Sequence, residues 1–218
     1  MIKMVGVLNI GQGSRPDLTE EIVRWAPGLQ MFHAGALDAL SEADIYRDKY
    51  RVPLLVNLSD GRPALAERDY ILERLERLVH GLTPVVDAFA VLCAEDFSAL
   101  QSEKPLFTLY GVAAALLPNL NLSRPVGAIC PVAGQVSSSK KKWRRAGLEV
   151  LVQAAAPGDG GAVHSALAYL KTNGVQTVIL DCAGFGRNEA LKLSADSGLT
   201  VLSLRGLMWS VVSQIAIP

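Results

Sequence analysis

The sequence predicts an α/β protein of two similar lobes, each built around a parallel sheet. Short β-rich runs alternate with helical stretches, and several strand runs are apolar throughout, as in sheets covered on both faces. The second half of the chain also repeats the first. With 218 residues, 50% hydrophobic and 19% charged, the chain is long enough for one large domain or two small ones.

The internal repeat is the most informative pattern. Three segments match in order: Val5-Gly6-Val7 with Val126-Gly127-Ala128, the strand before Cys93 with the strand before Cys182 (Val86 with Val175), and Leu109-Tyr110-Gly111-Val112 with Leu204-Arg205-Gly206-Leu207. The separation is 121 positions at the first match and 89 at the cysteines, so about 32 extra residues lie in the first half. We therefore predict lobes at residues 1–121 and 122–218, with a β-hairpin insertion at about 50–68. Chance similarity between α/β units is the alternative.

The first elements follow from local signals. Residues 5–10 form a continuous apolar run that is typical of a buried strand. A loop at 11–16 comes next, and Asp17 is expected to cap a helix that reaches Trp25. Residues 30–33 indicate a weaker strand.

A hairpin and an amphipathic helix follow. Residues 54–58 and 64–66 flank Asp60-Gly61, a turn pair that tolerates positive φ and so predicts a β-hairpin. The next helix carries one apolar stripe, made of Ile71, Leu72, Leu75, Leu78, Val79 and Leu82. Packing against the sheet is its expected role.

The rest of the first half predicts a strand at 88–92 ending at Cys93, a short helix, a strand at 106–109 and a helix at 112–117. The polar stretch 119–125, closed by a proline, is the expected boundary between the lobes. The repeat predicts the same order of elements in the second half.

Composition and charge restrict the partners. Lys plus Arg (21) equals Asp plus Glu (21), so no global field attracts nucleic acid or a membrane surface. We expect a small carboxylate-bearing or anionic ligand, no nucleic acid and no membrane. The basic cluster formed by Lys140, Lys141, Lys142, Arg144 and Arg145 is interpreted as a solvated helix start.

The cysteine count and the hydropathy indicate a cytoplasmic protein. Cys93, Cys130 and Cys182 are an odd set without a CxxC pair, which argues against a disulfide framework and a structural zinc site. No window approaches the roughly 18 uninterrupted apolar residues of a membrane span.

The repeated cysteines are the candidate catalytic residues. Cys93 and Cys182 both fall at the carboxyl end of a strand, where parallel α/β sheets bind ligands. Two such thiols aimed into one cleft could remove a proton from one face of a carbon and return one to the other. The alternative is that both are buried structural cysteines. Cys130 has Ile10 as its counterpart and is expected to line the core or the cleft edge.

The loop after the first strand is a candidate anion site. The amides of Gly11, Gln12, Gly13 and Ser14 could cradle a carboxylate or phosphate, with Arg15 as a bidentate partner. Asn9 and Gln12 are candidate orienting groups, and Pro131 and Val132 are their counterparts in the second half. A plain tight turn is the alternative.

Three motifs together resemble the AroM family: Ile10-Gly11-Gln12-Gly13-Ser14-Arg15-Pro16-Asp17-Leu18-Thr19, Cys130-Pro131-Val132 and Leu180-Asp181-Cys182-Ala183-Gly184-Phe185. The resemblance covers nearly the whole chain. It implies membership of the aspartate/glutamate and hydantoin racemase superfamily. Two Rossmann-like, flavodoxin-like lobes with an active site between them would follow, with chemistry that uses no cofactor and no metal. Cys93 and Cys182 would occupy the two catalytic positions.

The sequence departs from the racemase pattern after each cysteine. Those enzymes commonly carry Asn, Thr or Ser there to hold the substrate carboxylate, whereas Ala94 follows Cys93 and Ala183-Gly184 follow Cys182. Backbone N–H groups could still bind an anion. Asp181 would disfavour a thiolate if it pointed inward, but strand alternation predicts that it faces away from Cys182.

The function that these patterns favour is a cofactor-independent racemase or isomerase acting next to a carboxylate or carbonyl. Two alternatives stay open: an isomerase or decarboxylase that uses a single cysteine, and a small-molecule binding or regulatory protein without catalysis. The sequence also leaves a homodimer open.

Overall fold

The computed structural model describes residues 2–45 and 50–216 and divides the chain into two compact units. Unit 1 contains the described residues of Met1–Cys93, Phe97–Thr108 and Ser210–Pro218. Unit 2 contains Ala94–Asp96 and Leu109–Trp209. The sequence placed a single division after residue 121, whereas the chain changes units at several points and its last residues rejoin unit 1.

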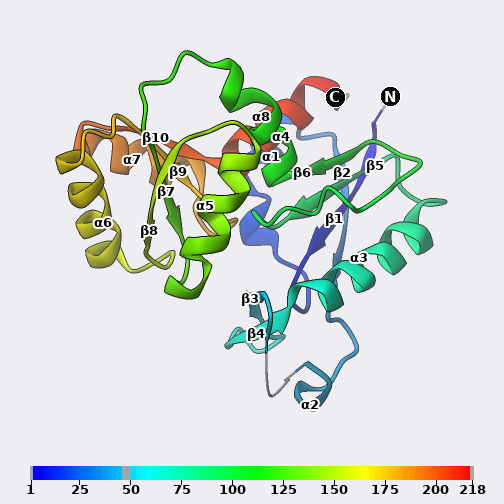
Figure 1. Cartoon of the computed structure of the whole chain (residues 1–218). Coiled ribbons are helices and arrows are strands. Elements are labelled where there is room, and N and C mark those ends of the chain that lie inside the picture. Colours follow the sequence, from blue (N-terminus) through cyan, green and yellow to red (C-terminus); the bar gives the residue numbers. More distant parts are fainter. Residues whose placement is uncertain (1, 46–49, 217–218) are drawn as a thin grey trace. The chain divides into compact units, whose positions relative to one another are not determined.

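Unit 1 contains a four-stranded parallel sheet in the order β2-β1-β5-β6 (Figure 1). Its strands are β1 (Met4–Asn9), β2 (Gln30–Gly35), β5 (Ala88–Leu92) and β6 (Leu106–Thr108). Its helices are α1 (Glu20–Trp25), α2 (Glu42–Ile45) and α3 (Arg68–Leu82), with a 3₁₀ turn at Pro16–Leu18. Helix α3 buries Ile71, Leu75 and Val79, the centre of the predicted stripe.

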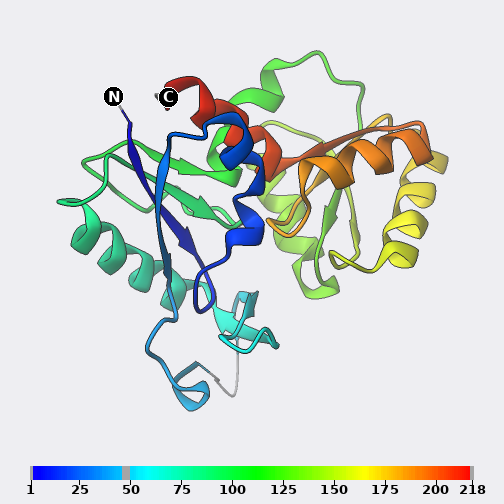
Figure 2. The ribbon, with the colours of Figure 1, turned by 180° about the vertical axis from the view of Figure 1, so that it is seen from behind.

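Unit 2 contains a second parallel sheet, in the order β10-β9-β7-β8. Figure 2 shows the chain from behind, with the residues of this unit coloured from green to orange-red. Its strands are β7 (Val126–Cys130), β8 (Val150–Ala154), β9 (Thr177–Leu180) and β10 (Thr200–Ser203). Its helices are α4 (Leu109–Leu116), α5 (Val136–Arg145), α6 (Gly160–Thr172) and α7 (Arg187–Ser197), with 3₁₀ turns at Leu117–Asn119 and Ala133–Gln135. Helix α8 (Leu204–Ile215) begins in unit 2 and ends in unit 1.

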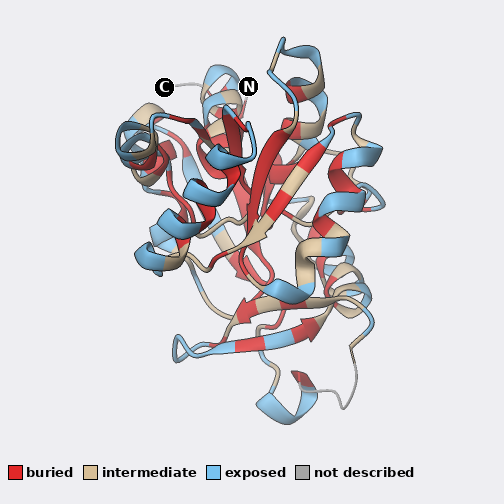
Figure 3. Cartoon of the chain, turned by 60° about the vertical axis from the view of Figure 1, so that its left-hand side comes forward, coloured by how far each residue is buried: buried red, intermediate tan, exposed pale blue. Residues whose placement is uncertain are grey.

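Helices cover both faces of the unit 2 sheet. In unit 2, α5 lies on the opposite side of β7 and β8 from α6 (Figure 1). The strands are mostly buried while the helices carry exposed faces, as Figure 3 shows. Both central strands that precede a candidate cysteine, β5 and β9, are buried along their whole length.

The two sheets share one topology. Numbering the parallel strands of each unit in chain order gives the same sheet order, 2-1-3-4, which is the flavodoxin-like arrangement. A matching close contact supports the equivalence: a Cβ on Gly6 would lie 3.5 Å from Val86, and a Cβ on Gly127 would lie 3.0 Å from Val175. These are the glycines and valines that the sequence repeat pairs.

The hairpin insertion is the third sheet. Strands β3 (Pro53–Asn57) and β4 (Pro63–Glu67) pair antiparallel around Gly61, whose φ is +84°. The hairpin binds the loop after β1, because the amide of Gln12 donates to the Asn57 carbonyl at 2.9 Å. The sequence predicted this hairpin but not its docking on the loop.

Two local predictions were wrong. Asp17 does not cap α1, which begins after Thr19, because the Asp17 carboxylate is bound by Arg15 at 2.7 Å and 2.9 Å. The short helix expected after Cys93 is absent from the described residues 94–105. There the Ala94 carbonyl accepts from the Lys142 side chain instead of a helical amide.

Within the described part of the chain, none of the helices has the length and apolar content needed to cross a membrane.

The close approach between the loop and the hairpin requires glycine at position 11. A Cβ on Gly11 would collide with the Asn57 carbonyl and lie 2.9 Å from the Asn57 amide nitrogen. Since backbone atoms cannot swing away, we expect Gly11→Ala to lower the free energy of unfolding by about 1–3 kcal/mol in a urea titration. Gly81→Ala in α3 is the control, because its Cβ meets nothing within 4 Å. It should be neutral or stabilise by up to about 1 kcal/mol. Equal stability of both variants would contradict the docking.

Candidate active site

Cys93 and Cys182 occupy the same position in their respective sheets. In unit 1, Val91 pairs with Leu8, and Cys93 lies two residues beyond Val91. In unit 2, Leu180 pairs with Ile129, and Cys182 lies two residues beyond Leu180. Because Leu8 and Ile129 are the penultimate residues of β1 and β7, strand register makes the two cysteines topological counterparts.

Cys130 is the last residue of β7, and the last residue of β1 is Asn9. The counterpart of Cys130 is therefore Asn9. The sequence comparison had wrongly given Ile10. The Cys130 thiol is buried and lies 3.5 Å from the carbonyls of Val132 and Gln153. Burial, followed by the charge of Asp181, raises the pKa of Cys130 to about 11. An inert core thiol is the result.

Cys182 is half-buried and sits over a tight turn. The Gly184 amide donates to its Sγ at 3.5 Å, and the Phe185 amide donates to its carbonyl at 3.3 Å. Burial raises the pKa of Cys182 to about 11, against the opposing effect of the Gly184 hydrogen bond. The negative charge of Asp181 adds to the increase, whereas Lys142 and Arg205 act against it. At neutral pH the sulfur is therefore a thiol, which suits a proton donor better than a base.

Asp181 is the centre of a buried polar cluster. Its Oδ1 accepts from Lys142 Nζ at 2.8 Å, and its Oδ2 accepts from Ser139 Oγ at 2.6 Å and Trp143 Nε1 at 3.0 Å. The three donors lie at i, i+3 and i+4 on one face of α5. Asp181 thus faces α5.

Lys142 corrects the interpretation of the basic cluster. Its side chain is only 5% exposed, although Lys140 and Lys141, which precede it, are exposed as predicted. Its Nζ also donates to the Ala94 carbonyl at 2.5 Å and lies 5.4 Å from the ring centres of Tyr110 and Trp143. Sequence reasoning missed this residue. The available signal was the spacing of Ser139 and Lys142 beside an apolar Trp.

The loop after β1 already holds an anion of the protein itself. The Gly11 amide donates to Asn9 Oδ1 at 2.8 Å, and the Gln12 amide donates to the Asn57 carbonyl. The Gly13 amide donates to Asp38 Oδ1 at 2.6 Å, while Oδ2 of Asp38 accepts from the Gly35 amide. Three of the amides proposed to cradle a ligand are therefore used within unit 1.

The side chains of this loop are also engaged. Asn9 donates to the Gly13 carbonyl at 2.7 Å, and Gln12 donates to the carbonyls of Leu37 and Leu40. Arg15 forms a bidentate pair with Asp17. Asn9 and Gln12 thus shape the loop, whereas Ser14 is exposed and Arg15 is half-buried.

The candidate residues fall into two groups. Unit 1 holds Cys93 and the loop residues Asn9, Gly11, Gln12, Ser14 and Arg15. Unit 2 holds Cys182, Ala94, Pro131, Val132, Ala183 and Gly184. Within unit 2, pairing of β7 with β9 brings the segment after Cys130 and the segment after Leu180 to the same sheet edge. Gly184 must be glycine, because a Cβ there would clash with Pro157, whose Cβ would be 2.9 Å away.

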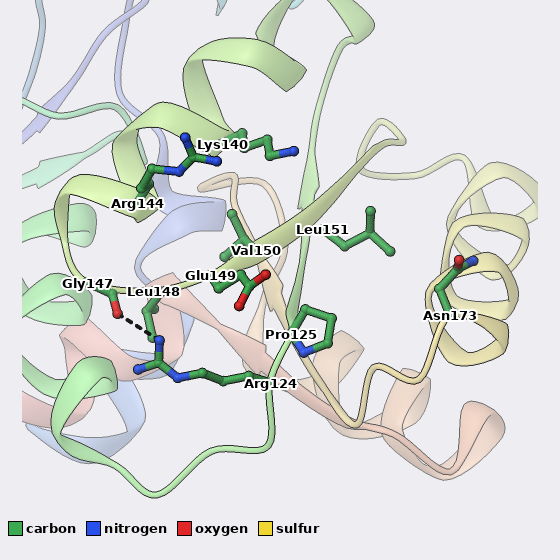
Figure 4. Close-up of a pocket in the computed structure, with 10 residues that line it drawn as sticks. All are labelled: Arg124, Pro125, Lys140, Arg144, Gly147, Leu148, Glu149, Val150, Leu151 and Asn173. Carbon is green, nitrogen blue, oxygen red and sulfur yellow. Dashed lines mark hydrogen bonds between the residues drawn. The ribbon is translucent and has the colours of Figure 1, made fainter.

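A surface pocket of about 590 Å³ lies at the opposite edge of the unit 2 sheet, where β7 and β8 begin (Figure 4). Arg124, Lys140, Arg144 and Glu149 line it, and Arg124 donates to the Gly147 carbonyl at 3.2 Å. These side chains are exposed. The pocket does not include the candidate cysteines. Among the described residues, no cluster of three or more His, Cys, Asp or Glu side chains could hold a metal ion.

Comparison with known proteins agrees with this architecture. The family model described as AroM protein matches residues 5–216. The chain belongs to the AroM family. No curated protein matches the AroM chain significantly.

Several solved structures share the fold of this AroM protein at low sequence identity. Glutamate racemase from Aquifex pyrophilus aligns with a TM-score of 0.60 and 16% identity over 97% of this chain and 83% of that one. Maleate isomerase Iso from Pseudomonas putida S16 aligns with a TM-score of 0.64 and 14% identity, over 99% of this chain and 94% of that one. Arylmalonate decarboxylase aligns with a TM-score of 0.67 and 11% identity, over 98% of this chain and 92% of that one. The α/β fold with two parallel sheets is thus shared with a racemase, an isomerase and a decarboxylase.

The buried ion pair predicts a large difference between neighbouring lysines. Lys142→Met leaves the Asp181 carboxylate buried without its counter-ion, so the free energy of unfolding should fall by about 3–5 kcal/mol. Lys141→Met, the same change at an exposed position of the same helix, should stay within about 0.5 kcal/mol of the wild type. Urea denaturation measures both values. A Lys142→Met variant as stable as Lys141→Met would contradict the buried pair.

Proposed function

We propose that this AroM protein is a cofactor-independent racemase or isomerase that transfers a proton at a carbon next to a carboxylate or carbonyl. Cys182 is the proton donor and Cys93 is the base. The observation that supports this most strongly is the equivalent strand register of the two cysteines, each two residues beyond a paired position of its sheet. The membership of the AroM family and the racemase-superfamily fold agree with the proposal.

The proposed reaction balances without a cofactor. The Cys93 thiolate removes the proton from the substrate carbon, and the electron pair of that C–H bond moves into the neighbouring carboxylate or carbonyl. The Cys182 S–H bond then breaks and its proton forms a new C–H bond with that electron pair, which leaves a Cys182 thiolate. The reverse reaction exchanges the two roles. A raised pKa at Cys182 favours its starting state as an acid.

Main-chain groups are the proposed carboxylate binders. Ala183 and Gly184 follow Cys182 in place of Asn, Thr or Ser side chains, and the Gly184 amide donates to the Cys182 sulfur. A substrate with a small carboxylate would be held by the Ala183 amide of this turn, with Pro131 and Val132 on the same sheet edge. Ser14 and Arg15 are the remaining proposed ligands from unit 1.

A single-cysteine isomerase or decarboxylase is the second candidate, and the state of Cys182 supports it. A thiol that stays protonated at neutral pH can protonate a carbanion that decarboxylation leaves behind, with no need for a second thiol. One structural neighbour is an arylmalonate decarboxylase. In this mechanism, loss of Cys182 abolishes turnover and loss of Cys93 does not.

Solvent deuterium incorporation tests the two-cysteine proposal. We would incubate the protein in D₂O with L-glutamate and with an arylmalonate, compounds on which two of the structurally similar proteins act, and record ¹H NMR spectra. We expect label at the acidic carbon of a substrate. Cys93→Ser and Cys182→Ser should each slow labelling by about 10²- to 10⁴-fold, because a serine hydroxyl is far less acidic than a thiol.

Cys130→Ser is the matched control. The Cys130 thiol is buried and contacts backbone carbonyls, so this substitution should reduce turnover little. Labelling by both single variants at the wild-type rate would overturn the proposal. Loss of activity in Cys182→Ser alone would favour the single-cysteine mechanism. Thermal stabilisation by one compound without labelling or turnover would favour a binding protein.

A further inference from the structure

Lys142 brings a buried charge to the strand end that carries Cys182. Its side chain is 5% exposed and that of Asp181 is 1% exposed. Taking two charges out of water is so costly that a buried ion pair is seldom more stabilising than apolar side chains of the same volume. Stability alone is therefore a weak explanation of this pair.

The contacts of Lys142 point to the candidate cysteines. One ammonium group donates to Asp181, which directly precedes Cys182, and to the carbonyl of Ala94, which directly follows Cys93. Ser139 and Trp143 hold the second oxygen of Asp181, so the carboxylate cannot rotate freely. The Asp181 amide donates to the Ile129 carbonyl at 2.8 Å, which fixes the backbone before Cys182 as well.

Further contacts hold Lys142 and its helix in place. The Tyr110 hydroxyl donates to the Lys142 carbonyl at 3.1 Å, and the rings of Tyr110 and Trp143 meet edge to face at 5.4 Å. The carboxylate of Asp96, two residues after Ala94, lies 3.7 Å from the guanidinium of Arg145, which belongs to α5 like Lys142. Helix α5 therefore carries the cations that hold segment 94–96 and the end of β9.

We propose that Lys142 is a positioning residue for Cys182: its ammonium neutralises Asp181 and ties the end of β9 to α5 and to Ala94, so that the thiol acts beside a neutralised carboxylate. This inference deepens the proposed function, and its role in turnover rests on that function. The effect of Lys142 on the Cys182 thiol does not rest on the proposed function, so this effect can be measured without a substrate.

The charges that act on Cys182 define the expected signs. Asp181 at the end of β9 disfavours the thiolate, while Lys142 on α5 and Arg205 on α8 favour it. Removing Lys142 exposes the thiol to an uncompensated Asp181 and should raise the pKa of Cys182. Removing the charge of Asp181 leaves Lys142 and should lower that pKa. Removing both charges should nearly restore the original value.

The test is the alkylation rate of Cys182 by iodoacetamide at pH 8.0, followed by peptide-resolved mass spectrometry. Well below the pKa, one unit changes the thiolate fraction tenfold, and the opposing change in nucleophilicity leaves about threefold in rate. We expect Lys142→Met to slow alkylation about threefold and Asp181→Asn to accelerate it about threefold. The double variant should lie within about twofold of the wild type. Lys141→Met is the matched control and should leave the rate unchanged.

A purely structural role predicts a different pattern. Loosened packing would expose the thiol and accelerate alkylation in both single variants, and more strongly in the double variant. That result, or unchanged rates in both single variants, would overturn the proposal. If Lys142→Met does not fold, Asp181→Asn and the double variant still decide, since only a charge effect is reversed by the second change. Deuterium labelling by wild-type protein tests the proposed function separately.

Discussion

The buried Asp181 carboxylate is the interaction on which the candidate site depends. Asp181 directly follows the central strand β9, and both of its carboxylate oxygens accept hydrogen bonds from one helix, from Ser139, Lys142 and Trp143 of α5. A carboxylate at this depth is tolerated only when it is paired and hydrogen-bonded. The pairing therefore fixes α5 against the carboxyl end of the unit 2 sheet and fixes the chain that enters Cys182.

The two sheets supply equivalent cysteines in unlike surroundings. Both sheets have the order 2-1-3-4, and both cysteines follow the third strand. The residue before Cys93 is the apolar Leu92, whereas the residue before Cys182 is Asp181 with its cluster. One topology thus carries two different electrostatic settings. In the proposed reaction one of these cysteines starts as the acid and the other as the base.

The features that the sequence predicted are those that local chemistry determines. The apolar strands, the hairpin at Asp60-Gly61 and the stripe of α3 follow from periodicity and turn residues. Partners distant in sequence were not predictable. Lys142 is part of a basic run that predicts a solvent-exposed helix face, and its partner, the Asp181 carboxylate, lies 39 positions later in the sequence. Likewise, the amide of Gly13 binds Asp38, 25 positions away, so the loop that resembles an empty anion cradle is occupied.

The central claim is that Cys182 rests as a protonated thiol that serves as an acid. A ¹³C NMR titration of the protein labelled with [3-¹³C]cysteine measures this directly, because the Cβ shift changes when the sulfur ionises. Assigned with Cys182→Ser, the Cys182 signal should remain that of a thiol through pH 9 and move towards the thiolate only near pH 11. A thiolate signal for Cys182 at pH 7 would contradict the account.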